Sequence, residues 1–90
     1  MPHARIISTE FKSKEDLEIA IIAWKKWCPD NMPVSLSRYI VRTGDNSTMM
    51  TTVYENEELL GQAQVIAAEW WKMYGHHVYE TIVFDGPVMD

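Results

Sequence analysis

Two adjacent histidines, His76 and His77, follow Gly75 and are the residues in this sequence best suited to acid–base chemistry. Imidazole titrates near neutral pH, so it can act as an acid, a base or a metal ligand. Neighbouring residues of an extended segment point in opposite directions, so this pair should not bind one metal together, and at most one ring should face a pocket. The simpler interpretation is a histidine near a helix C-terminus, where the helix dipole favours positive charge.

The tryptophans form two clusters, each near the C-terminal end of an expected helix. Trp24 and Trp70 share the core-facing sides of these helices, whereas Trp71 lies about 100° from Trp70, so one of that pair should approach a surface or an interface. Indole rings could bind a planar aromatic ligand, and Tyr39 and Tyr74 are further aromatic candidates. The alternative is that these rings only fill the core and a dimer interface.

Arg38 is the cation with the clearest candidate role. It lies on the same alternation phase of an expected strand as Arg42. A planar guanidinium can fix a carboxylate or an enolate. The alternative is that it pairs with acids on neighbouring strands, and Glu10, Glu55 and Glu80 are available as partners.

The charge of the chain excludes some partners. Its 90 residues contain 8 Lys and Arg against 13 Asp and Glu, which gives a net charge of −5. Nucleic-acid binding depends on a basic surface, which this chain does not offer. The longest apolar run, Ile19 to Trp24, is far shorter than the ~20 residues of a membrane span.

The composition indicates a single folded domain over residues 1–90. Hydrophobic residues make up 47% of the chain, which is typical of globular domains. The lone Cys28 cannot form an intramolecular disulfide, and the sequence lacks zinc-ligand spacing. We therefore expect no metal and no cofactor, and a reducing cytoplasm as the location.

These residues must be positioned by six elements. Four segments have strand patterns, with apolar residues on both alternation phases: Ala4 to Lys12, Val34 to Arg42, Ser47 to Glu55 and Val78 to Phe84. Two segments between them repeat apolar residues at helical spacing, and these begin after Ser13 and after Asn56. The order is β-α-β-β-α-β.

Local signals set the expected boundaries. Ser13 and Asn56 can cap the two helices. Pro29 should end the first helix, which would put Lys25 and Lys26 in its last turn, and Gly75 should end the second helix in a left-handed conformation. The turn residues Gly44 to Ser47 predict a hairpin, and Asp85 to Pro87 should break the last strand.

This order predicts a ferredoxin-like fold, a four-stranded antiparallel sheet with two helices on one face. Another α+β sandwich with a different strand order is the alternative. Because the strands are apolar on both phases, the far face of the sheet should need cover. A second copy of the sheet could supply it around a two-fold axis, so we expect a homodimer.

The segment Thr51-Thr52-Val53-Tyr54-Glu55-Asn56-Glu57-Glu58-Leu59, together with this order of elements, resembles the dimeric α/β-barrel superfamily. That superfamily includes antibiotic-biosynthesis-type monooxygenases, haem-degrading monooxygenases and stress-responsive barrel proteins. The resemblance implies a dimeric barrel in which Tyr54 occupies a place usually held by Trp. The haem-degrading branch uses an Asn on its first strand, and this sequence has none there.

Three functions are compatible with these residues. The first is binding of an apolar or aromatic small molecule between sheet and helices. The second is a cofactor-independent monooxygenase or isomerase, in which Tyr54, one of the two histidines and Arg38 hold an enolate or phenolate while the tryptophans exclude water. The third is a structural or regulatory dimer without catalysis. An enclosed pocket containing His or Arg would favour the second, and a filled core the third.

Overall fold

Local sequence signals start both helices where the sequence predicts. The Ser13 hydroxyl oxygen accepts a hydrogen bond from the Asp16 backbone N–H at 3.1 Å, and the Asn56 side chain accepts one from Leu59 N–H at 2.9 Å. Each bond satisfies an amide that the first turn of a helix leaves without a partner. Both capping predictions are confirmed.

The computed structural model describes residues 1–89. Its elements in chain order are β1 (His3–Phe11), α1 (Lys14–Asn31), β2 (Ser37–Arg42), β3 (Ser47–Tyr54), α2 (Glu57–Tyr74), a short 3₁₀ helix η1 (Gly75–His77) and β4 (Val78–Pro87). The order β-α-β-β-α-β is confirmed. β1 and β3 differ from their expected bounds by one residue at the ends.

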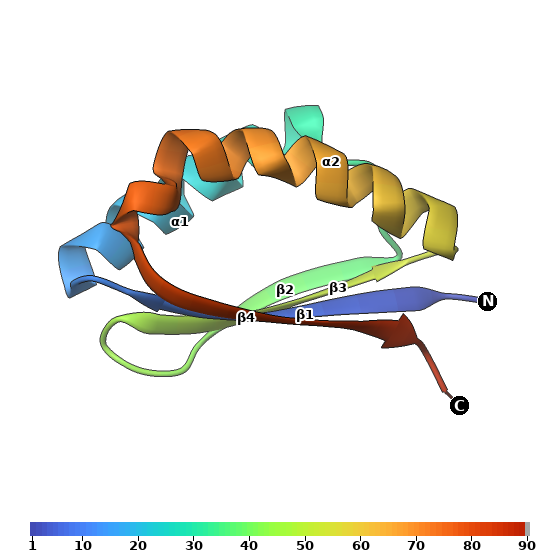
Figure 1. The fold of residues 1–90 in the computed structure, drawn as a ribbon, viewed down its shortest axis with the longest axis horizontal. Helices are drawn as coiled ribbons and strands as arrows, with labels where there is room; N and C mark the ends of the chain where they lie inside the picture. Colours follow the sequence, from blue (N-terminus) through green and yellow to red (C-terminus); the bar gives the residue numbers. More distant parts are fainter. Residues whose placement is uncertain (90) are drawn as a thin grey trace.

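The four strands form one antiparallel sheet in the order β2-β3-β1-β4. Both helices cover the same face of this sheet, and the opposite face is bare (Figure 1). The predicted ferredoxin-like fold is therefore confirmed. Neither helix within residues 1–89 is apolar over a length that could cross a bilayer.

Helix α2 ends at Tyr74, just before Gly75, as predicted, but the end of α1 and the conformation of Gly75 differ from expectation. Pro29 lies inside α1, which continues to Asn31, so the prediction that Pro29 ends the helix is wrong, and Lys25 and Lys26 are not in its last turn. A proline this near the end removes only one helical bond, and Met32 N–H still donates to Cys28 O at 2.9 Å. Gly75 is not left-handed: its φ is −61°, and the chain tightens there into η1.

Two strand boundaries also differ. Val34 and Leu36 lie outside β2 and are 86% and 60% exposed, so their apolar character did not indicate a strand. β4 runs through Asp85 and Gly86 to Pro87, so the expected break at Asp85 is wrong. β4 is an edge strand, and Pro87 is tolerated at its end, where a missing N–H costs no ladder bond.

The core lies between the helices and the covered face of the sheet and forms two clusters. The larger one contains Phe11 from β1, Trp24 and Cys28 from α1, and Trp70 from α2. The smaller one surrounds Tyr54 at the other end of α2, and its buried members are Tyr54, Leu60 and Ala63. Alternate residues of β1, β2 and β3 face the space between these clusters.

The bare side of the sheet carries apolar side chains in two cross-strand rows. Tyr39, Thr51, Ile6 and Phe84 pair in succession across the sheet, as do Val41, Met49, Ser8 and Ile82. We call the apolar members the outer face: Ile6, Tyr39, Val41, Met49, Ile82 and Phe84. Tyr39 is 56% and Phe84 is 62% exposed in the single chain.

Candidate functional site

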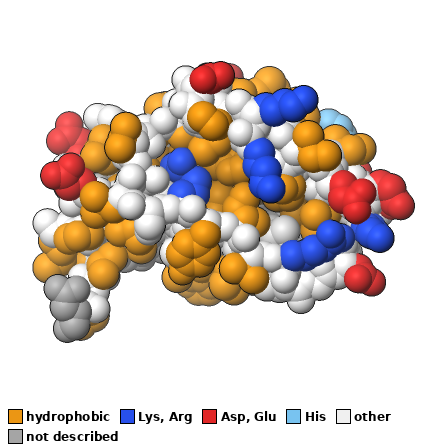
Figure 2. All heavy atoms as spheres, turned by 180° about the vertical axis from the view of Figure 1, so that it is seen from behind, with side chains coloured by type: hydrophobic (Ala, Val, Ile, Leu, Met, Phe, Trp, Pro, Cys, Tyr) orange, Lys and Arg blue, Asp and Glu red, His pale blue; other side chains and the backbone are white. Residues whose placement is uncertain are grey.

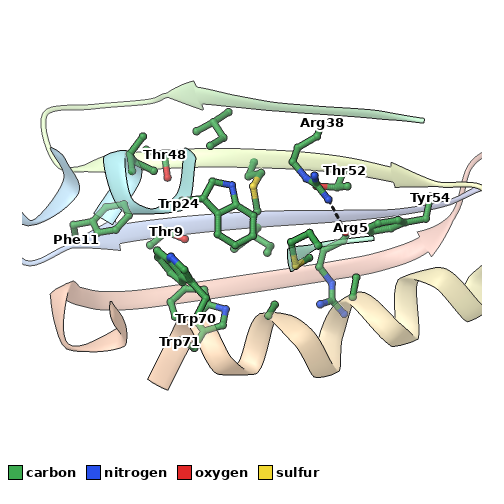
Figure 3. A pocket seen from close by; sticks show the side chains of 17 residues that line it. Arg5, Thr9, Phe11, Trp24, Arg38, Thr48, Thr52, Tyr54, Trp70 and Trp71 are labelled. Atoms are coloured by element: carbon green, nitrogen blue, oxygen red, sulfur yellow. Dashed lines mark hydrogen bonds between the residues drawn. The ribbon is translucent and has the colours of Figure 1, made fainter. Parts of the chain in front are cut away.

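A cavity of about 60 Å³ lies between the sheet and the two helices, and 17 residues line it (Figure 3). One water needs roughly 10–15 Å³ of such space, so the cavity holds a few waters or a small chemical group. Its two ends differ in chemistry. Arg5, Arg38 and Tyr54 form a polar end, and the rings of Phe11, Trp24, Trp70 and Trp71 form an aromatic end.

Arg38 extends from β2 into the polar end and is held by three neighbours. Its guanidinium donates to the Tyr54 hydroxyl oxygen at 3.0 Å and to the Cys28 sulfur at 3.1 Å, and its Nε donates to the Thr52 hydroxyl at 3.4 Å. The guanidinium carbon also lies 5.9 Å from the centre of the Tyr54 ring. Arg38 and Thr52 are cross-strand partners, so the hairpin register sets this contact.

The positive charge of Arg38 has no negative partner. Within residues 1–89, Arg38 forms no ion pair with an Asp or Glu side chain. Burial raises the pKa of the Cys28 thiol, and the nearby Arg38 opposes this only in part. Cys28 is therefore a neutral thiol at pH 7 and offers no negative charge to the half-buried guanidinium at the cavity wall.

Arg5 at the same end is neutralised. Its guanidinium forms a two-pronged contact with Asp85 on β4, with N···O distances of 2.7 and 2.9 Å. This geometry is the strongest that an Arg and a carboxylate form. Glu10, Glu55 and Glu80, which the sequence offers as partners for Arg38, form an ion pair with neither arginine within residues 1–89. Arg38 is thus the uncompensated cation of the cavity.

Three buried threonines that were not predicted as site residues also line the cavity: Thr9, Thr48 and Thr52. Thr48 and Thr52 lie on the same alternation phase of β3 as Tyr54, so their position on the inner face was predictable from the sequence. Hydroxyl groups on an otherwise apolar inner face give the cavity hydrogen-bonding capacity.

The predicted aromatic residues divide between two places. Trp24, Trp70 and Trp71 line the cavity, with Trp70 edge-on to both other rings at centroid distances of 5.3 and 5.2 Å. The Trp70 indole N–H is buried and has no hydrogen-bond partner within the described chain. Tyr74 stacks on Trp70 but does not line the cavity, and Tyr39 lies on the outer face.

The histidines lie outside the cavity. His76 and His77 belong to η1, and their ring centroids are 4.0 Å apart, so the expectation that they point in opposite directions is wrong. The 3₁₀ turn replaces the extended backbone on which that expectation rested. His77 Nδ1 contacts Asp16 Oδ1 at 2.6 Å. Residues 1–89 contain no cluster of three or more side chains suited to a metal.

The contact between Asp16 and His77 predicts a pH effect on stability. Hydrogen bonds from His77 and then from Ser13 hold the pKa of Asp16 below its ordinary value. On acidification the unfolded chain binds this proton first, so the contribution is complete above about pH 3.9 and is lost as the pH falls towards the lower folded-state pKa. Asp16→Asn should lower Tm at neutral pH, and its deficit should shrink below pH 4, as measured by circular dichroism.

Glu15→Gln is the matched control, because Glu15 is an exposed acid in the same helical turn. Both substitutions remove one negative charge near the helix N-terminus, so the dipole effect cancels in the comparison. Equal Tm deficits for the two variants at every pH would contradict a specific role for the contact with His77.

Comparison with known proteins concerns the fold. No family model matches the sequence, and no curated protein matches it. Among solved structures, a dimeric ferredoxin-like protein from an uncultured marine organism superposes with a TM-score of 0.80 at 14% identity, covering 99% of this chain and 89% of that one. The chain has the same ferredoxin-like fold as that protein.

Two further solved structures share this fold. SnoaB from Streptomyces nogalater, a cofactor-independent oxygenase, superposes with a TM-score of 0.76 at 8% identity, covering 99% of this chain and 94% of that one. A candidate antibiotic biosynthesis monooxygenase from Caulobacter crescentus gives 0.76 at 9%, covering 99% and 91%. The predicted resemblance is thereby confirmed for the fold.

Proposed function

We propose that this protein binds a small apolar or aromatic molecule that carries an anionic oxygen, between the sheet and the helices. The observation that supports this most directly is the uncompensated guanidinium of Arg38 at the wall of an apolar cavity. A half-buried charge without a counter-ion is unfavourable, and a bound carboxylate, phenolate or enolate would offset that cost. The Tyr54 hydroxyl would donate a second hydrogen bond to the same anionic oxygen.

The shape of the cavity favours a flat ligand. An anion held by Arg38 and Tyr54 would extend its apolar part towards the rings of Trp24, Trp70 and Trp71 (Figure 3). Those rings offer large rigid faces at little entropic cost. Because the cavity is only about 60 Å³, even a ligand with a single ring would need side chains on its walls to move apart.

Calorimetric titration with matched probes tests this proposal. Benzoate and 2-naphthoate are anions, and benzamide and 2-naphthamide are their neutral counterparts of nearly the same shape. We expect the anions to bind at least about tenfold more tightly, since the only difference is the charge facing Arg38. Equal affinity for the anions and the amides, or binding of neither, would remove the proposal.

An enzymatic role is the second candidate, and the described activity of SnoaB favours it. Arg38 and Tyr54 could stabilise an enolate or phenolate electrostatically, as a monooxygenase or isomerase would need. His76 and His77 do not line the cavity, so transfer of a proton from a ligand there to either ring needs a route beyond the contacts described above. Oxygen uptake with an enolisable aromatic ketone would indicate the oxygenase, and exchange of its acidic C–H without oxygen uptake the isomerase.

We also propose that two copies pack through the outer face. This proposal is supported by the two rows of exposed apolar side chains on the bare side of the sheet. In addition, one protein of the same fold is described as dimeric. Contiguous exposed apolar patches of this kind mark interaction surfaces. An interface around a two-fold axis would bring each patch against its own copy.

A charge placed in the outer face should prevent this assembly. Met49 lies on the central strand β3, and Met49→Lys would bring two cations into the interface, so we expect the dimer dissociation constant to rise on the order of 100-fold. Val65→Lys is the control, because Val65 is 74% exposed on α2. Light scattering should give twice the chain mass for the wild type and the control. A monomeric wild type would contradict the proposal.

A further inference from the structure

A second, open cleft adjoins the cavity along β2. It has a volume of about 450 Å³ and lies between the C-terminal half of α1 and the edge strand β2. Trp24, Arg38 and Ile40 line both the cleft and the cavity, so these three side chains form the wall between the two spaces. Arg38 is therefore reachable from outside through the cleft.

The cleft carries positive charge on an acidic protein. Lys25 on α1 and Arg38 on β2 both line it, and none of its lining residues is Asp or Glu. Neither cation forms an ion pair with any of the described residues. On this side of the molecule, Lys and Arg side chains lie around an apolar hollow, and Asp and Glu side chains lie at the left and right ends and at the top edge (Figure 2).

We infer that this cleft is the entrance to the cavity and that Lys25 steers anionic aromatic ligands to Arg38. This inference rests on the proposed function and adds a route and a selection step to it. Lys25 and Arg38 line the same cleft, and both would attract an approaching carboxylate. The aromatic ring of the ligand would then pack against the apolar side chains of Trp24 and Ile40. The net charge of −5 lowers the association rate of anions with the protein as a whole, and a local positive charge at the cleft would offset this effect.

Stopped-flow quenching of tryptophan fluorescence by 2-naphthoate tests the inference. In Lys25→Glu we expect the association rate at low salt to fall about 5- to 10-fold, because the steering charge is reversed. The dissociation rate should stay within about twofold, since Lys25 lies outside the cavity. The rate difference should shrink at high salt, where the Debye length is shorter.

Lys26→Glu is the matched control. Lys26 is the next residue and is also exposed, but it does not line the cleft, and its substitution changes the net charge by the same amount. Its association rate should stay close to that of the wild type. The rate for neutral 2-naphthamide should be the same in all three proteins, because steering acts on charge.

The association rates of these variants distinguish failure of the entrance from failure of anion binding. Equal slowing by Lys25→Glu and Lys26→Glu, or no slowing by either, would overturn the entrance while leaving anion binding intact. Failure of the wild type to bind 2-naphthoate would overturn both. Slowing confined to Lys25→Glu and to the anionic probe is the result expected here.

Discussion

Replacing Arg38 by Met should raise the Kd for an anionic aromatic ligand roughly 30- to 1,000-fold, because removing one partner of a buried, hydrogen-bonded charge pair costs roughly 2–4 kcal/mol. The guanidinium is the uncompensated cation of the cavity, and its contacts to Tyr54, Cys28 and Thr52 fix its direction. Affinity for the neutral amide should change little.

The fold should survive this substitution. Met fills a similar space without a charge, and removing a half-buried cation that has no counter-ion offsets the loss of its hydrogen bonds to Tyr54, Cys28 and Thr52. We expect a Tm close to that of the wild type, which distinguishes lost binding from lost folding. Arg38→Lys should give intermediate affinity, because an ammonium keeps the charge but not the planar fork.

Arg42→Met is the control for the loss of any arginine from β2. Arg42 lies on the same phase of the strand but donates to the carbonyl oxygens of Gly44 and Asp45 in the turn. The affinity of the Arg42→Met variant for 2-naphthoate should equal that of the wild type. If the Arg38→Met variant still bound the anion more tightly than the amide, a residue other than Arg38 would have to bind the carboxylate.

The largest expected effect on stability comes from Trp70→Ala, at about 3–5 kcal/mol of unfolding free energy. Trp70 is only 4% exposed, stacks on Tyr74 at 5.3 Å and meets Trp24 and Trp71 edge-on. Small domains are stable by roughly 5–15 kcal/mol in total, so this variant should be near the limit of folding. Urea unfolding followed by circular dichroism measures the change.

Trp70→Phe should be much milder, by about 1–2 kcal/mol, since it keeps an aromatic ring in the cluster. The indole N–H has no hydrogen-bond partner within the described chain, so Phe loses area but no hydrogen bond. A Phe variant as unstable as the Ala variant would show that the indole N–H makes a contact beyond those described.

The order of elements was predictable because its signals are local. Ser13 and Asn56 cap their helices, and the Gly44 to Ser47 turn joins β2 to β3, each through residues close in sequence. The errors arose where distant residues decided the conformation. Asp85 reads as a strand breaker by itself, but Arg5, eighty positions away, pairs with it and β1 holds it in the ladder.

The candidate site was predictable in part for the same reason. Arg38 and Tyr54 were expected as functional residues, and the hairpin register brings them together. The isolation of the Arg38 charge could not be read from the sequence, because it depends on which acids approach in space. His76 and His77 were the strongest chemical signal, yet the short 3₁₀ turn places them with Asp16 and outside the cavity.

The position of β4 at the edge of the sheet bears on aggregation. A ten-residue edge strand exposes unpaired backbone groups on which further chains could add. Here Glu80 places a charge along that edge strand and Pro87 removes an amide donor at its end, and both oppose such addition. Growth by pairing along the β4 edge, the route to fibrils, is thereby disfavoured, whereas the proposed contact through the outer face would close at two copies.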